Sequence, residues 1–180
     1  MKTDSDTVLS TRKLELGCGE RPTPGYLHQD VMRLPGLLEM DYYSPPWDIP
    51  LPEESLDEVL ALGVVEHIRF ADVPKTFAHM HKLLAAGGVM LFDVPDMRVW
   101  VNYLYMHLVF GDKRYIPFDL HHVWSTFYGW QRWEGDEHKS GWTRDTILPV
   151  LTAAGFSRVE EGLTPFRERG LERRRFERPE

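Results

Sequence analysis

Short runs of alternating or apolar residues that end at turn residues recur through the first half of the chain. Residues 13–16 (KLEL) alternate and meet Gly17, residues 26–31 (YLHQDV) form a second run, and residues 56–65 form a longer apolar one. Runs of this length between turn residues are typical of strands. The pattern therefore predicts strands at these three places and a weaker one at 37–43. The stretch SPPWDIPLPEES between them predicts a loop.

A helical pattern follows. Apolar residues recur there at the spacing of one helix face, at Val73, Phe77, Met80 and Leu84. Pro74 suits the first turn of this helix, and Gly87 suits the position just past its end. Residues 89–94 (VMLFDV) then predict a strand of the kind found in sheets covered on both faces. Strand, helix and strand in this order predict an α/β fold with a Rossmann-like, mostly parallel sheet and helices on both faces.

The segment 97–142 has a different composition, because it holds five of the six tryptophans. Residues 98–110 (RVWVNYLYMHLVF) are apolar nearly all round, so a helix there should be buried by a lid, a partner chain or the sheet. A last helix should follow, with Thr143 as its N-cap, Gly155 at its end and Pro149 as a kink or a later start. A final strand should come after it.

Length and composition narrow the classes of protein. At 180 residues the chain is most simply one domain, with a core at 13–96, an aromatic-rich insertion at 97–142 that could be a substrate lid or plain core packing, and a C-terminal helix, strand and charged tail at 143–180. The net charge of −7 argues against a nucleic-acid partner. We expect no membrane span and no signal peptide, and the single cysteine fits the cytoplasm. The arginines between 167 and 178 alternate with glutamates, which favours a solvated tail or an edge strand.

The turn after the first strand supplies the first chemical clue. Gly17, Cys18 and Gly19 give the start of a dinucleotide motif, but Pro22 stands where the third glycine should be. Residues 20–25 are too few for the helix that would face a pyrophosphate. The turn therefore suits an adenosyl ligand without phosphate, such as S-adenosylmethionine, and Asp30 is placed to bind its ribose hydroxyls.

Several ordered motifs carry a family resemblance. They are LELGCGERPTPGYLHQDV, IPLPEESLDEV, LALGVVEHI, KLLAAGGVMLFDVPD and HKSGWTRDTILPVLTAAGFSRVE, and they span residues 13–96 and 138–160. In these motifs the chain resembles the class I S-adenosylmethionine-dependent methyltransferases, in particular a compact subgroup with a shortened first connection and no first helix. Ala85–Ala86 replaces a common Lys-Pro, and Gly63–Val64 replaces a polar residue and a histidine.

The resemblance implies a binding site for S-adenosylmethionine, with S-adenosylhomocysteine as the product. By that resemblance Asp30 would bind the ribose, Asp41 the adenine amine and Glu15 the ligand's amino group through water. The remaining residues would line the ligand mostly through their backbone: Gly17, Cys18, Gly19, Tyr42, Leu62 and Gly63. Asp30, Asp41 and the Glu66–His67 pair could instead serve the fold alone.

A general base is needed only if the acceptor loses a proton during methyl transfer. The candidates are His67, Asp96 and His138, and each could instead be a surface or structural residue. No metal site is expected, since the histidine pairs 79/81 and 121/122 lack the spacing and partners of a zinc site.

Three functions remain open. The first is a methyltransferase acting on a small molecule or a glycan, which could form a homodimer through residues 98–110. The second is a non-catalytic relative that binds the cofactor or acts as a partner subunit. The third, a nicotinamide-dependent reductase, is disfavoured by the missing third glycine.

Overall fold

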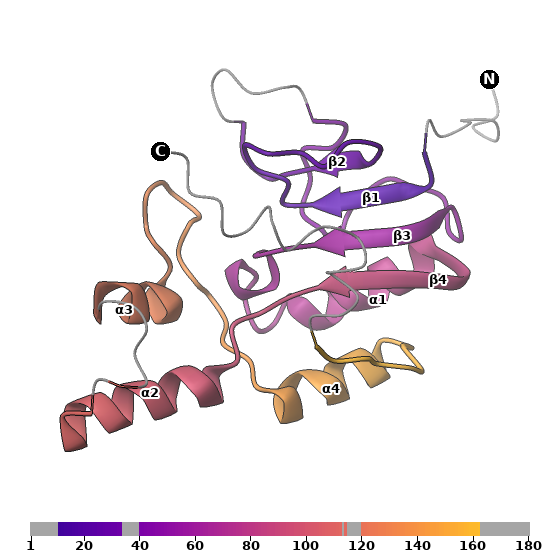
Figure 1. The fold of residues 1–180 in the computed structure, drawn as a ribbon. Helices are drawn as coiled ribbons and strands as arrows, with labels where there is room; N and C mark the ends of the chain where they lie inside the picture. Colours follow the sequence, from indigo (N-terminus) through magenta and orange to yellow (C-terminus); the bar gives the residue numbers. More distant parts are fainter. Residues whose placement is uncertain (1–10, 34–39, 113, 115–119, 163–180) are drawn as a thin grey trace, which may run out of the picture.

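Four parallel strands form one sheet in a computed structural model that describes residues 11–33, 40–112, 114 and 120–162 (Figure 1). The strands β1 (Lys13–Leu16), β2 (Leu27–Gln29), β3 (Leu56–Ala61) and β4 (Leu84–Phe92) lie in the order β2-β1-β3-β4. Leu14 pairs with Leu27 on one side and with Val59 on the other, which places β1 inside the sheet. The predicted α/β fold with a mostly parallel sheet is confirmed.

The connection between β1 and β2 contains turns and no helix, as predicted. The weaker strand at 37–43 is reduced, among the residues described, to a single parallel bridge between Gln29 and Tyr42. Residues 34–39 lie outside the described residues, as does the arginine-rich segment after 162. Residues 156–162 form no strand, so the final strand is wrong for the part of it that the structure describes.

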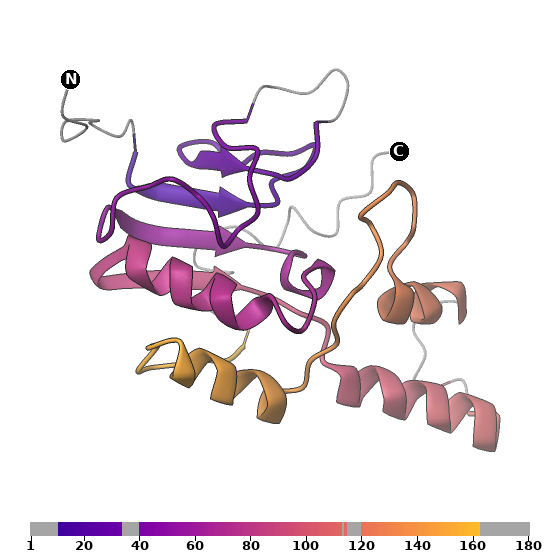
Figure 2. The same ribbon diagram turned by 180° about the vertical axis from the view of Figure 1, so that it is seen from behind.

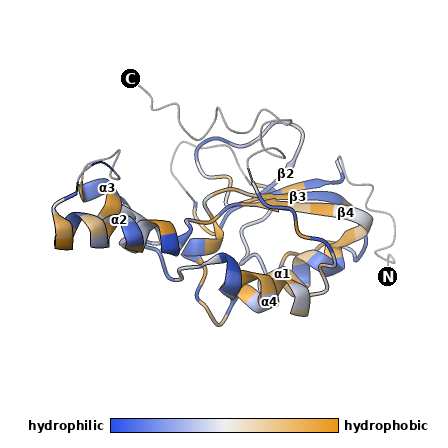
Figure 3. Cartoon of the chain, turned by 60° about the horizontal axis from the view of Figure 1, so that its bottom comes forward, coloured by the Kyte–Doolittle hydropathy of each residue, from blue (hydrophilic) through white to orange (hydrophobic). Residues whose placement is uncertain are grey.

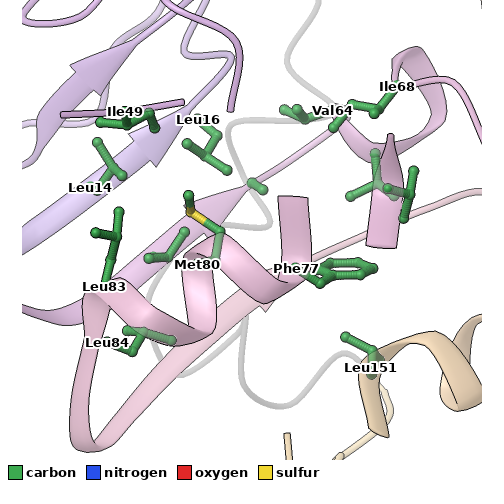
Figure 4. Close-up of a cluster of buried hydrophobic side chains, with 14 of the residues drawn as sticks. Leu14, Leu16, Ile49, Val64, Ile68, Phe77, Met80, Leu83, Leu84 and Leu151 are labelled. Atoms are coloured by element: carbon green, nitrogen blue, oxygen red, sulfur yellow. The ribbon is translucent and has the colours of Figure 1, made fainter. Parts of the chain in front are cut away.

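Two helices, α1 (Val73–Leu83) and α4 (Arg144–Ala153), pack on one face of the sheet (Figures 2 and 3). Val73, Phe77 and Met80 of the predicted helix face are fully buried. With Leu14 and Leu151, they belong to the core between the sheet and the helices (Figure 4). Burial of such side chains contributes roughly 1.5–3 kcal/mol each to folding.

The end of α1 corrects one prediction. The helix stops at Leu83 and not near Gly87, because the backbone of Leu84 is extended and pairs with Leu56 of β3. Pairing with the sheet therefore begins five residues before the predicted strand. Pro74 lies in the first turn of α1, as predicted.

The second face of the sheet differs from the expectation. Among the described residues no helix covers it, and only Leu84 of β4 is buried, while Val89 is 40% exposed. The continuous apolar character of this strand therefore did not indicate a strand covered on both faces.

The last helix follows its sequence signals. The Thr143 side chain and the backbone N–H of Thr146 form one half of a capping box, and the Thr146 hydroxyl and the backbone N–H of Thr143 form the other. Pro149 lies inside the helix, and Gly155 follows its end with a φ of +107°. A left-handed glycine just past the end is a common helix stop.

The aromatic insertion extends beyond the sheet as two helices, α2 (Met97–Phe110) and α3 (Leu120–Tyr128) (Figures 1 and 3). α2 buries none of its residues, so neither the sheet nor a lid among the described residues covers this apolar helix, and a partner chain is the expected cover that a single chain does not test. Its exposed side chains include Val101, Tyr105, Leu108, Val109 and Phe110. Where the insertion leaves and rejoins the body, the backbone N–H of Met97 donates to the carbonyl of Trp142 at 2.9 Å. No helix within the described residues has both the length and the apolar composition that a membrane crossing needs.

Candidate functional site

A cavity of about 530 Å³ lies where the strands β1, β2 and β3 end. Carboxyl ends of parallel strands meet at one edge of a sheet, which is where open α/β folds bind ligands. Five of the predicted site residues share its wall: Gly17, Gly19, Asp30, Gly63 and His67. The volume lies in the range of roughly 300–1,000 Å³ that is typical of small-molecule sites.

The Asp30 carboxylate is fixed by two backbone amides. Its Oδ2 accepts the N–H of Gly19 at 3.0 Å, and its Oδ1 accepts the N–H of Met32 at 2.9 Å. Each carboxylate oxygen has a second lone pair. Asp30 can therefore keep both bonds and still accept hydroxyl protons from a ligand in the cavity.

Both glycines of the turn have left-handed backbones, for different reasons. Gly17 has a φ of +55°, and a Cβ there would lie 2.7 Å from Cγ2 of Val64, so the position has no room for a side chain. Gly19 has a φ of +54°, but a Cβ there would meet no atom within 4 Å. The side chain of Gln29 supports this turn, because its Oε1 accepts the N–H of Gly17 at 3.2 Å.

Gly63 forms the wall after β3 with a φ of +63°. Its N–H donates to Oδ1 of Asp93 at 2.7 Å, and Asp93 directly follows β4. This bond ties the ends of β3 and β4 together. Sequence reasoning did not select Asp93, although its place after an apolar strand was a usable signal.

The other predicted cofactor residues do not line the cavity. Glu15 accepts hydrogen bonds from the backbone and hydroxyl of Thr23, and Asp41 accepts the N–H of His28 at 2.7 Å. Tyr42 joins its backbone to β2 and packs on the core. Leu62 also stands outside the cavity.

Cys18 is buried and does not line the cavity. Its thiol donates to the sulfur of Met40 at 3.1 Å. Burial, together with the negative charges of Asp30 and Glu15, raises the pKa of Cys18 to about 12. The thiol is therefore protonated at neutral pH and contributes its backbone, not its sulfur, to the turn.

The opposite wall comes from loops, and most of it belongs to the aromatic insertion that was expected as a substrate lid, although none of these residues was selected individually. It includes Trp47 and, from the end of the insertion, Arg132, Trp133, Asp136 and Lys139. The Arg132 guanidinium lies 4.1 Å from the centre of the Trp133 ring. Burial raises the pKa of Asp136, but hydrogen bonds from Arg132 outweigh it, so the net shift is downward. This wall offers aromatic faces beside fixed charges.

The three base candidates lie in different surroundings. His67 faces the cavity, and its ring centre lies 4.8 Å from that of His138, which stands behind it. Burial lowers the pKa of both histidines. Asp96 instead caps α2 by accepting the N–H of Arg98 at 3.0 Å, away from the cavity wall. Its geometry fits a structural cap.

Comparison with known proteins finds a family model that is similar to part of the chain. Residues 19–92 match the family model described as "Methyltransferase domain". This segment includes the second half of the glycine turn, Asp30, Gly63 and His67. No curated protein sequence matches the chain.

Several solved structures are similar to this chain, and the first named here shares its fold. A SAM-dependent methyltransferase from Archaeoglobus fulgidus superimposes with a TM-score of 0.52 at 13% identity, over 91% of this chain and 79% of that one. One from Thermotoga maritima gives 0.48 at 13% identity, over 84% and 67%. A chain of the complex between the Haloferax volcanii Trm112 methyltransferase activator and a methyltransferase gives 0.47 at 16% identity, over 91% and 76%.

Proposed function

We propose that this chain is a class I S-adenosylmethionine-dependent methyltransferase that methylates a small molecule or a glycan, with its matching segment and its fold as support. The observation that carries the proposal is the cavity in which Gly17, Gly19, Asp30 and Gly63 meet at the ends of parallel strands. This wall suits an adenosyl ligand without phosphate.

In the proposed binding mode, Asp30 accepts the ribose hydroxyls while Gly19 and Met32 hold its carboxylate in place. Gly17 and Gly63 let the backbone approach the methionine part closely, since neither has a Cβ. The cavity lining does not include five of the predicted residues: Glu15, Cys18, Asp41, Tyr42 and Leu62. We assign them the task of shaping the turn and β2, and direct contact by Asp41 or Tyr42 would require a local movement.

S-adenosylmethionine supplies a methyl group on a sulfonium, and the acceptor atom displaces the neutral thioether in line. Alignment of the two partners in one cavity is therefore the main task of the protein, and it can lower the barrier by roughly 7–11 kcal/mol. His67 is the candidate with access to the cavity that could take a proton from an acceptor hydroxyl. Asp96 lies outside the wall, so we give it no part in catalysis.

The acceptor class is inferred from the insertion side of the cavity. Trp47 and Trp133 offer flat apolar faces, and Arg132, Asp136 and Lys139 offer charges and hydrogen bonds. Aromatic faces beside polar groups fit a sugar or a planar ring.

Two further proposals concern the setting of the protein. We propose that α2 pairs with α2 of a second copy, because its apolar side chains are exposed in the single chain. An apolar helix without a covering element is typical of an interaction site. We also assign the protein to the cytoplasm, since a single buried thiol suits a reducing compartment.

The test is calorimetry with S-adenosylhomocysteine, followed by a methyl-transfer assay on a panel of sugars and small aromatic metabolites. We expect binding at one site per chain and turnover of at least one acceptor. Binding without turnover would favour the non-catalytic partner role. Binding of NADH without binding of S-adenosylhomocysteine would overturn the proposal in favour of a reductase.

A further inference from the structure

Three side chains with metal-binding groups converge beside the cavity. Glu66 and His67 are neighbours in the short helix η1 (Val65–His67), and His138 comes from the end of the insertion. One ligand atom from each of the three lies within 4.8 Å of the others. Residues about seventy positions apart thus form a cluster that no local spacing in the sequence could reveal.

Backbone hydrogen bonds hold the two halves of this cluster together. The carbonyl of Glu66 accepts the N–H of Lys139 at 2.7 Å and the N–H of Ser140 at 3.0 Å. The hydroxyl of Ser140 also donates to the carbonyl of Val65 at 3.1 Å. His138 therefore has a fixed place relative to η1, as a metal site requires of its ligands.

Both imidazoles are oriented by backbone carbonyls. Nδ1 of His67 lies 3.1 Å from the carbonyl oxygen of Glu137, and Nδ1 of His138 lies 2.7 Å from that of Thr126. A carbonyl oxygen only accepts, so each Nδ1 carries the proton. In a neutral ring this leaves the lone pair on Nε2. Metal-binding histidines almost always have such a second bond from their other ring nitrogen.

The surroundings favour a cation. The Glu66 side chain is buried, and the residue is only 4% exposed. Asp136 lies close enough to interact with both histidines electrostatically, and Glu137 with His67, so their field is negative. The positive charge of Lys139 opposes this negative field at His67. Lys139 also forms an ion pair with Glu137 at 3.1 Å, which offsets part of its charge.

We propose that Glu66, His67 and His138 bind a divalent transition-metal ion, with zinc as the best match. Two imidazoles and one carboxylate are a common zinc set, and catalytic zinc sites keep one further position open. Tetrahedral ligands at zinc lie about 3.3 Å apart. A modest closing of the side chains around the ion is therefore expected.

The place of the cluster suggests what the ion does. His67 faces the cavity whereas His138 does not, so the ion would lie at the wall, with its open position toward the cavity. An oxygen bound to zinc loses its proton more easily than a free one. An acceptor hydroxyl bound there would release its proton to water, so with the ion bound His67 would serve as a ligand and not as the base; this role alone rests on the proposed function.

The first test uses the full chain after treatment with a chelator, titrated with zinc sulfate by calorimetry in the absence of cofactor. We expect one site per chain. His138→Ala and the nearly isosteric Glu66→Gln should each weaken the binding at least tenfold. His121→Ala is the matched control, since His121 is exposed on α3 outside the cluster, and it should bind as the wild type does. Near-ultraviolet circular dichroism checks that each variant keeps its fold.

A second test replaces zinc with cobalt(II) and records the visible spectrum. Bands of a four- or five-coordinate ion in the wild type, lost in His138→Ala and kept in His121→Ala, would support the site. The proposal is overturned if the wild type shows no one-to-one zinc binding, or if His121→Ala weakens it as much as His138→Ala. Failure here would leave binding of S-adenosylhomocysteine intact, so the two proposals are tested separately.

Discussion

Oδ2 of Asp30 accepts the backbone N–H of Gly19 at 3.0 Å. This bond joins the end of β2 to the turn after β1 without any helix between them. The residue proposed to bind the ribose and the backbone proposed to line the methionine part therefore form one unit. The geometry of the turn depends on the carboxylate even before a ligand binds.

Replacement of Asp30 should weaken binding of S-adenosylhomocysteine. Asp30→Ala removes charged hydrogen bonds that are typically worth about 1.5–3 kcal/mol each. We expect affinity to fall by roughly ten- to a hundredfold in calorimetry. Asp57→Ala is the matched control, because Asp57 is exposed and pairs with Arg12 at the opposite end of β3. Equal losses in both variants would remove Asp30 from the site.

Gly17 and Gly19 should respond differently to alanine. At Gly17 the new Cβ would lie 2.7 Å from Val64 in a left-handed backbone, so we expect a loss of about 2–4 kcal/mol in urea unfolding. At Gly19 the new Cβ meets no atom, so we expect only the cost of a left-handed backbone, about 1–2 kcal/mol. The Gly19 variant should still lose cofactor affinity if the ligand fills the space beside it.

The contact with Val64 provides the control for that prediction. Val64→Ala removes the methyl groups that the new Cβ would meet. The double variant with Gly17→Ala should therefore be less destabilised than the sum of the two single changes. Simple additivity would show that the close contact has no energetic weight.

The thiol of Cys18 should resist alkylation in the folded protein. With a pKa of about 12, only about one thiol in ten thousand is ionised at pH 8, whereas a free cysteine is ionised to about a quarter. Reaction with iodoacetamide should be very slow in buffer and fast in denaturant. Asp30→Asn should raise the native rate, since the negative charge of Asp30 helps to raise this pKa. Equal rates in buffer and denaturant would contradict the burial of the thiol.

A charge on α2 should disrupt the proposed dimer. Leu108 is 60% exposed in the single chain, so Leu108→Glu costs little within one copy. In a dimer the same carboxylate would be buried in an apolar interface, which is costly. We expect light scattering after gel filtration to show a dimer for the wild type and a monomer for the variant. Lys75→Glu on α1 is the control, and a monomeric wild type would refute the dimer.

The sequence predicted the fold correctly where the spacing of apolar residues along the chain matches the side chains that are buried. The face of α1 is such a case, since Val73, Phe77 and Met80 are all buried. The end of α1 failed because Leu84 pairs with a strand residue far away in the sequence. The cover of α2 stays a prediction, because the apolar character of a helix does not say whether the same chain or a partner covers it.

The cavity could be predicted only on the side that strands build. Gly17, Asp30 and Gly63 follow successive parallel strands, and their convergence is a property of the topology. Trp133 and Lys139 belong to an irregular stretch whose position depends on hydrogen bonds to η1. No periodicity marks such a stretch, so the tryptophan-rich composition indicated the insertion as the substrate side but not which of its residues line the cavity.

The bond between Met97 and Trp142 brings the two ends of the insertion to one point of the body. A segment whose two ends lie together can be replaced without moving the strands of the sheet. Relatives could exchange it for another of different length and chemistry while the strand ends proposed to hold the adenosyl group stay as they are. Exchange of this one segment would then change the acceptor. Chimaeras joined at Met97 and Trp142 should retain nucleoside binding.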